Sequence, residues 1–283
     1  MRIGVGLPNS IPYATGALLL DWARRAERLG FSGLSTIGRV AYPTYEELVA
    51  LAAVAGATER IGLTTGVLLG PTREPVILAK QAAALDQLSG GRFVLGVGVG
   101  GRPDDFEATG LDIHDRGRRW DRALEIMHAA WRGETVPGSP KPVSPRPVNG
   151  ESVPILIGGG AAAAVQRAVR WGIGWTAGGG GPQRAAPMFE KVGAAWAAAG
   201  RRGEPEFRGL HYFALGGNSE KGRDYLADYY GPFADAIWPS VARDREALRE
   251  VMRGFEEAGT DELYLSPTIA SIEQLDLLAE AVL

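Results

Sequence analysis

The chain has 283 residues, of which 45% are hydrophobic, and this is enough for the core of one large α/β domain or of two small ones. Its formal net charge is −3 and it has no long basic run, so a nucleic acid is not expected as a partner. It has no cysteine, which excludes disulfides and thiolate chemistry, and its three histidines lack the paired spacing of a zinc site, so no metal is expected. No leader-like segment precedes the first strand-like run and no apolar run reaches the ~18 residues of a membrane span, so we expect a cytoplasmic protein without a membrane partner.

Strand-like and helix-like segments alternate along the first part of the chain. Short apolar runs that end at glycine or proline predict strands over 3–7, 31–37 and 61–69. Apolar residues at helical spacing predict helices over 17–29, 43–55 and 75–88.

The segment 91–101 reads GRFVLGVGVGG, and its apolar run, too short for a helix, predicts a fourth strand buried on both faces. Its glycines at 96, 98, 100 and 101 are favoured where something flat lies close to the backbone. The string Gly96-x-Gly98-x-x-Gly101 also matches a dinucleotide fingerprint, which needs a helix at the third glycine and an acidic residue about 20 positions on. Because Arg102-Pro103-Asp104-Asp105 follows instead, we interpret the glycines as a flat platform at the mouth of a barrel.

The alternation continues after a long helix over 114–132 and a proline-rich surface excursion over 133–152. Further strands are predicted over 153–157, 174–177, 207–215 and 262–266. A helix that ends at 171 is predicted after the first of these strands. Further helices are predicted over 182–199, 220–230, 244–258 and 273–283. Eight strand–helix units predict one domain over 1–283, a (β/α)8 TIM barrel with an insertion segment, and an open doubly wound sheet is the alternative.

In such a barrel, functional sites lie at the carboxyl ends of the strands. Two of these ends, Gly158–Gly160 and Gly178–Gly181, are glycine-rich and lead directly into helices. Exposed N–H groups at a helix start bind anions, so both are candidate phosphate cradles, although glycines also serve tight turns. Beside the fourth strand they fit a phosphorylated flat ring, with the ring over strands three and four.

Few charged side chains fall at strand ends. Arg39 ends the second strand and is either a site cation or a surface charge. Asp105 and Glu107 are either acid/base groups or solvated loop carboxylates. His211 and Tyr212 lie on the seventh strand, where an inward side chain would reach a ligand.

Several segments resemble the bacterial luciferase-like monooxygenase family, which includes deazaflavin F420-dependent reductases and dehydrogenases. The resemblance covers nearly the whole chain, and the order and spacing of its motifs are specific to that family. The motifs are Ala55–Leu69 (AGATERIGLTTGVLL), 75–84, Leu85–Gly98 (LDQLSGGRFVLGVG), Asp105–Gly110 (DFEATG) and Val153–Gly159 (VPILIGG).

The resemblance implies reduced FMN or coenzyme F420 at the strand ends, with the Gly66–Val67 peptide at or near a non-proline cis bond behind the ring. The cofactor-binding residues that it implies are Thr65, Gly66, Val67, Gly98, Val99, Gly100, Gly158, Gly159, Gly160, Thr176, Gly178, Gly179 and Gly180. The loops beyond them suggest a substrate pocket that includes Arg39, Tyr42 and Tyr212. Members of the family are usually homodimers.

The chain also departs from the family. Gly38 and Arg39 stand where many relatives have an acidic residue and a histidine, and Gly101 stands where F420-dependent sugar dehydrogenases have a glutamate. Because these proton-transfer groups are missing, we expect a monooxygenase that uses reduced FMN on a small organic substrate. A separate reductase would supply the reduced FMN. The alternatives are an F420-dependent hydride-transferring reductase and a non-catalytic flavin-binding protein.

Overall fold

The structure, a computed structural model, describes residues 1–217 and 219–283. Within them, nine strands form one parallel sheet in the order β3-β2-β1-β9-β8-β7-β6-β5-β4, and the pairing of β3 with β5 closes it into a ring. β4 (Leu68–Leu69) continues β3 (Gly62–Thr65) along the same neighbour, β5 (Phe93–Gly98), so the ring is an eight-stranded barrel. The predicted (β/α)8 barrel is therefore confirmed, and the open doubly wound sheet is wrong.

Every predicted strand is present, within a few residues of its expected bounds. The remaining strands are β1 (Arg2–Gly6), β2 (Gly33–Thr36), β6 (Ile155–Gly158), β7 (Gly174–Thr176), β8 (Glu206–Phe213) and β9 (Glu262–Pro267). β5 pairs with β3 and β6, and its side chains at Phe93, Leu95 and Val97 are fully buried. A strand enclosed on both faces needs a continuous apolar run, which is why this segment was recognisable in the sequence.

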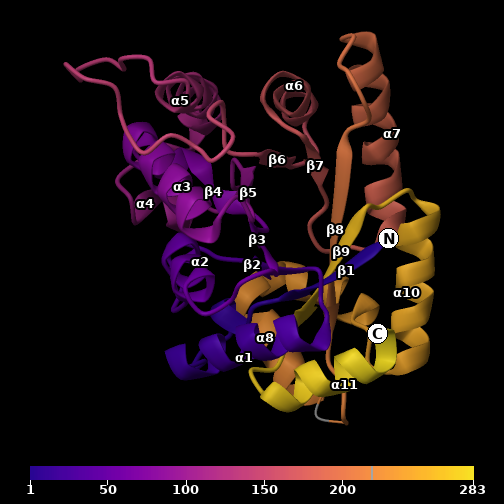
Figure 1. Ribbon diagram of the computed structural model, residues 1–283. Helices are drawn as coiled ribbons and strands as arrows, with labels where there is room; N and C mark the ends of the chain where they lie inside the picture. The colour runs from indigo at the N-terminus through magenta and orange to yellow at the C-terminus, as the bar shows by residue number, and fades with distance from the viewer. Residues whose placement is uncertain (218) are drawn as a thin grey trace.

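Most helices pack around the outside of the barrel, and α8 (Ser219–Tyr230) lies over its mouth (Figure 1). The other long helices are α1 (Gly16–Leu29), α2 (Glu47–Ala55), α3 (Pro75–Ser89), α5 (Arg116–Trp131), α6 (Ala162–Trp171), α7 (Pro182–Ala198), α10 (Arg245–Glu257) and α11 (Ile272–Val282). α4 (Pro103–Glu107) and α9 (Ala234–Ile237) were not predicted, because neither is long enough to show helical periodicity.

The predicted start of the second helix at Pro43 is wrong. α2 begins only at Glu47, because the side chain of Glu46 accepts a hydrogen bond from the backbone N–H of Val49 and so forms the N-cap. Residues 37–46 remain a loop, and this loop lies over the carboxyl end of β2.

The long excursion after α5 loops away from the barrel and contains no helix or strand over 133–152 (Figure 1). The stripe of Trp120 and Trp131 on α5 faces inward, and both rings are buried as expected of core residues. Trp131 Nε1 donates to the carbonyl of Ala79 at 2.9 Å, which ties α5 to α3. Across the described ranges, no helix is both long and apolar enough to span a membrane.

Candidate active site

A cavity of about 190 Å³ opens at the carboxyl ends of the strands. We call it the mouth cavity. Gly66 and Val67 line it after β3, Gly178 and Gly179 line it after β7, and Tyr212 of β8 lines it together with two tyrosines of α8. The predicted residues Arg39, Gly66, Val67, Gly178, Gly179 and Tyr212 are thus brought together from distant parts of the chain.

The Gly66–Val67 peptide is cis, as the resemblance implied. The chain from Thr65 to Val67 occupies the space left by the missing side chains of three glycines. A Cβ at Gly96 would lie 1.9 Å from the carbonyl oxygen of Thr65, and Cβ atoms at Gly98 and Gly158 would lie 2.9 and 3.1 Å from the methyl groups of Val67. The interpretation of the strand-four glycines as a bare platform therefore needs correction at Gly96 and Gly98, because Val67 fills the space there and forms the surface itself, whereas Gly101 has open space around it and lines the mouth cavity.

Other residues predicted to bind the cofactor lie behind or beside this surface. Thr65 is buried and its hydroxyl donates to the carbonyl of Gly96 at 2.7 Å. Gly98 is buried behind Val67, and at this end of β5 it is Gly101 and Arg102 that line the mouth cavity. Thr176 is buried at the end of β7.

The two glycine-rich tips have the geometry of anion sites. Gly159, Gly160 and Gly178 are exposed, and neither Ala161, which precedes α6, nor Gly181, which precedes α7, provides a side-chain cap. The first N–H groups of both helices therefore lack a side-chain acceptor, and the helix dipole favours an anion there. These tips are the candidate phosphate site.

Glycine is also required by the backbone at one of these tips. Gly180 and Gly181 have φ angles of 127° and 78°, which side-chain-bearing residues rarely adopt. The exposed Arg184 lies directly above, with its Cδ 2.8 Å from where a Cβ of Gly180 would be. Arg184 was not predicted as a site residue, although the predicted helix over 182–199 places it in the first turn.

Arg39 lies inside the protein. Its guanidinium pairs with Asp104, lies 3.6 Å from a carboxylate oxygen of Asp105, and donates to the carbonyl of Tyr229 at 3.2 Å. Arg39 thus ties the loop after β2 to α4 and α8, and it is not a surface charge.

Neither carboxylate suggested as an acid/base group is placed for that role. Asp105 is buried and accepts hydrogen bonds from the backbone N–H groups of Val40 and Ala41 at 2.8 and 2.9 Å. It is therefore a structural acceptor, not a solvated loop residue. Glu107 is exposed and outside the mouth cavity.

His211 does not reach the mouth cavity. It is buried, its Nε2 bonds to the carbonyl of Ser240 at 2.7 Å, and its ring packs against Phe255 of α10. The suggested contact with a ligand is therefore wrong, because the alternation along β8 turns Tyr212 inward and His211 outward.

Five tyrosines pack in one cluster, and α8 provides three of them, Tyr225, Tyr229 and Tyr230. Tyr212, Tyr229 and Tyr230 of this cluster line the mouth cavity. The hydroxyls of Tyr212 and Tyr230 are 2.6 Å apart, and Tyr225 bonds to Ser10 at 2.7 Å. Burial raises the pKa of Tyr212, Tyr225 and Tyr229 well above its ordinary value, so their hydroxyls stay protonated.

Tyr42 donates to Asp228 and lines an adjoining side cavity of about 300 Å³, not the mouth cavity. The α8 tyrosines were missed because the sequence does not reveal that this helix folds back over the barrel. Their spacing, at 225, 229 and 230, was the available signal.

The space left by Gly38 holds a carboxyl group from another element. A Cβ at Gly38 would lie 2.4 Å from Oε1 of Glu47, which stands in the first turn of α2. Glu47 is buried, accepts from Arg73 at 3.0 Å, and burial raises its pKa from 4.5 to about 7. The expectation that no acid lies at the end of the second strand therefore needs correction.

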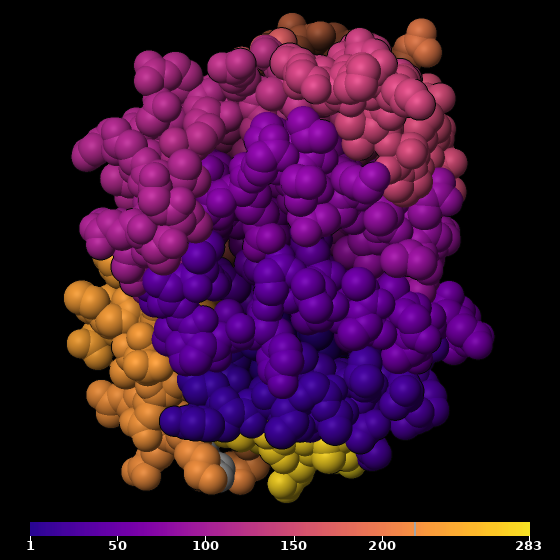
Figure 2. All heavy atoms as spheres, turned by 90° about the vertical axis from the view of Figure 1, so that its left-hand side faces the viewer, coloured from indigo at the N-terminus to yellow at the C-terminus, as the bar shows by residue number. Residues whose placement is uncertain are grey.

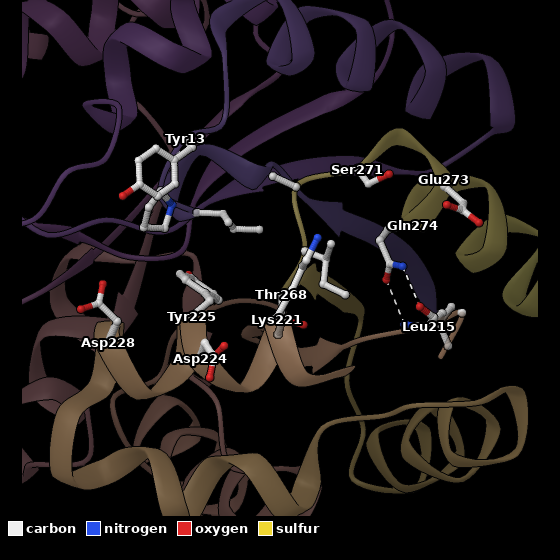
Figure 3. Close-up of a pocket in the computed structure, with 15 residues that line it drawn as sticks. Tyr13, Leu215, Lys221, Asp224, Tyr225, Asp228, Thr268, Ser271, Glu273 and Gln274 are labelled. Atoms are coloured by element: carbon white, nitrogen blue, oxygen red, sulfur yellow. Dashed lines mark hydrogen bonds between the residues drawn. The ribbon is translucent and has the colours of Figure 1, made fainter. Parts of the chain in front are cut away.

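A larger hollow of about 630 Å³ lies between α8 and the loops that follow β1 and β9 (Figure 3). Exposed charges line it, among them Lys221, Asp224 and Asp228 of α8, with Tyr13 on the opposite side. The amide of Gln274 accepts from the backbone N–H of Leu215 at 2.9 Å and donates to its carbonyl at 2.7 Å. None of the predicted cofactor residues lines this hollow, so the smaller mouth cavity is the better candidate active site.

Comparison with known proteins agrees with this geometry. The family model for luciferase-like monooxygenases matches residues 1–277. An uncharacterized protein of Mycobacterium tuberculosis is 28% identical over 290 residues, which cover 92% of this chain and 93% of that protein.

Among the part of the chain that the structure describes, no group of three or more His, Asp or Glu side chains is placed to hold a metal ion.

Solved structures of related enzymes share the fold. An F420-dependent secondary alcohol dehydrogenase, in complex with an F420–acetone adduct, superposes with a TM-score of 0.81 at 18% identity over 99% of this chain and 98% of that one. The oxygenating constituent of 3,6-diketocamphane monooxygenase from Pseudomonas putida, in complex with FMN, gives 0.74 at 14% identity over 99% and 95%. The family match over nearly the whole length shows that the chain belongs to the luciferase-like monooxygenase family and is an enzyme of that oxidoreductase class.

Proposed function

We propose that the protein oxygenates a small organic substrate with reduced FMN. The observation that carries the cofactor part of this proposal is the pair of uncapped helix starts, at α6 and α7, and the residues before α7, Gly178 and Gly179, line the mouth cavity. Two adjacent N-termini form a strong anion site, and an anion site next to a barrel mouth fits a cofactor that is a ring with a phosphate tail.

The residues at the mouth fit such a group. The phosphate would be held by the backbone N–H groups of the glycine tips, with Arg184 as a counter-charge. The ring would lie over Val67, whose surface is apolar and is supported from behind by the backbone at Gly98 and Gly158. When bound, a reduced flavin supplies the electrons with which dioxygen is activated.

The chain's own part is to exclude water and to orient the substrate. Tyr212, Tyr229 and Tyr230 cover the mouth, and the pairing of Arg39 with α4 and α8 holds that cover in place. The mouth cavity, at about 190 Å³, is smaller than the about 300–1,000 Å³ of typical small-molecule sites, so beside a ring that lies over Val67 it suits only a small substrate.

Hydride transfer with coenzyme F420 is the second candidate. The observation that favours it is the carboxyl of Glu47 beside Gly38, because hydride transfer to or from an oxygenated carbon requires a proton-transfer group. F420 also has a ring and a phosphate, so the glycine tips suit it equally. The third candidate is a non-catalytic flavin-binding protein. Turnover of any substrate by the purified protein would reject it.

Oxygen uptake separates these candidates. Purified protein with reduced FMN and a panel of small organic substrates should show substrate-dependent oxygen consumption and an oxygenated product. Substrate-dependent oxidation of reduced F420 without oxygen uptake would contradict the FMN proposal and favour the reductase. Substrate-independent oxygen uptake alone would also contradict it.

We further propose a homodimer formed through α2 and α3. Val49, Ile77 and Leu88 on these helices are 66%, 54% and 71% exposed, and α2 and α3 are in contact with each other, so these apolar side chains support an interface there. Figure 2 shows this face, with α2 and α3 in purple across its centre. A separate reductase that supplies the reduced cofactor, and a cytoplasmic location, stay predictions of the sequence.

A further inference from the structure

The mouth cavity is lined by two arginines that differ in their surroundings. Arg39 is neutralised by Asp104 and Asp105 and donates to the carbonyl of Tyr229. Among the described residues, Arg102 forms no ion pair with a carboxylate within 4.0 Å, and the nearby Asp104 and Asp105 are engaged with Arg39. The mouth therefore keeps one cation without a protein counter-charge.

Arg102 is held by aromatic faces. Its guanidinium carbon lies 5.5 Å from the ring centroids of both Tyr229 and Tyr230. Stacking on a ring fixes the plane of a guanidinium but leaves its N–H edge free to donate. Because the side chain is only half-buried and lines the cavity, these donors are accessible to a ligand.

A hydroxyl donor accompanies this cation. Tyr212 and Tyr230 share one hydrogen bond of 2.6 Å, which uses one of their two O–H groups. Within the described chain, neither hydroxyl bonds to any other group, so one O–H remains to donate. A guanidinium with a phenolic O–H beside it matches the several acceptor lone pairs of a carboxylate.

Besides the two arginines, Asp105 is the charged residue of the lining, and its carboxylate is occupied by Arg39 and by the backbone N–H groups of Val40 and Ala41. Ile37, Leu69 and Leu210 line the same cavity and offer no charge. From these contacts we infer that the substrate is a small apolar or aromatic carboxylic acid, whose carboxylate Arg102 binds while its apolar body packs against these side chains. This inference rests on the proposed function, since it assigns the substrate of the same site.

Binding of matched acids and amides tests the inference. Calorimetric titrations would use benzoate and phenylacetate against benzamide and phenylacetamide, on the protein alone and on the protein with its reduced cofactor under anaerobic conditions. We expect at least one acid to bind about tenfold or more tightly than its amide, because charge-assisted hydrogen bonds contribute that much. Arg102→Gln should remove the difference, and Arg102→Lys should restore part of it.

Arg118→Gln is the matched control, because Arg118 is exposed and pairs only with Asp115 on the described surface. It should leave the difference unchanged. Equal affinities for acids and amides, no binding of any acid, or a difference that survives Arg102→Gln would overturn the inference. So would a weaker affinity of Arg102→Gln for the cofactor with unchanged affinity for the acids. Failure of the wild type to bind either cofactor would instead reject the proposed function. The difference in affinity between acids and amides, measured on the protein alone, would still test whether Arg102 binds a carboxylate.

Discussion

Replacing Glu47 by glutamine perturbs the one carboxyl that is buried beside Gly38. Burial raises its pKa from 4.5 to about 7, so the folded protein holds a proton there that the unfolded chain has already lost. A group of this kind stabilises the fold fully below pH 4.5, and the contribution is lost as the pH rises to about 7.

The size of the effect follows from the two pKa values. A difference of about 2.5 pH units corresponds to at most about 3 kcal/mol, because each unit is about 1.4 kcal/mol. Glutamine carries no charge at any pH, so Glu47→Gln should remove this pH dependence. Arg73 keeps Glu46 as a partner at 2.6 Å, so the substitution does not leave the guanidinium unpaired.

Urea unfolding at pH 5 and pH 8, followed by tryptophan fluorescence, measures the free energy of unfolding of both proteins. We expect the wild type to lose about 2–3 kcal/mol relative to Glu47→Gln between the two pH values. Glu107→Gln, at an exposed carboxylate, should follow the wild type. If the difference between wild type and Glu47→Gln is the same at both pH values, or changes in the opposite direction, the reasoning is wrong.

Three further substitutions test other parts of the account. Gly96→Ala should unfold the barrel or destabilise it by more than about 3 kcal/mol in urea, since its Cβ would lie 1.9 Å from the carbonyl of Thr65, whereas Gly101→Ala, with open space around it, should cost below about 1 kcal/mol. Gly178→Asp should weaken binding of the reduced cofactor about tenfold or more by repulsion of its phosphate, while Gly178→Ala, which also meets open space, should bind nearly as the wild type does in fluorescence titrations. Val49→Asp should shift the proposed dimer to a monomer in light scattering, and an unchanged mass would exclude α2 from the interface.

The barrel was predictable because its strands and helices have separate periodicities. The buried run of β5 and the glycine breaks after β6 and β7 are local features, and each fixes where a strand ends. The carboxyl ends of parallel strands meet at one side of the barrel, so the approximate place of the candidate site followed from the same pattern.

The chemistry around the mouth cavity was less predictable, because it depends on side chains that meet only after folding. From the sequence, Glu47 is expected on the exposed face of a helix. Its carboxyl is instead buried in the space left by the missing side chain of Gly38. His211 and Tyr212 are adjacent in sequence, yet one faces α10 and the other the mouth. Tyr229 and Arg102 come from segments whose approach no local pattern encodes.

The central claim is that the glycine tips and Val67 hold a reduced ring cofactor by its phosphate and its ring. Anaerobic fluorescence titration of the purified protein with FMN and with F420, each oxidised and reduced, tests it most directly. The account predicts that reduced FMN binds tightly and that inorganic phosphate competes with it. Tight binding of F420 alone would transfer the claim to the hydride-transferring alternative, and binding of neither cofactor would contradict it.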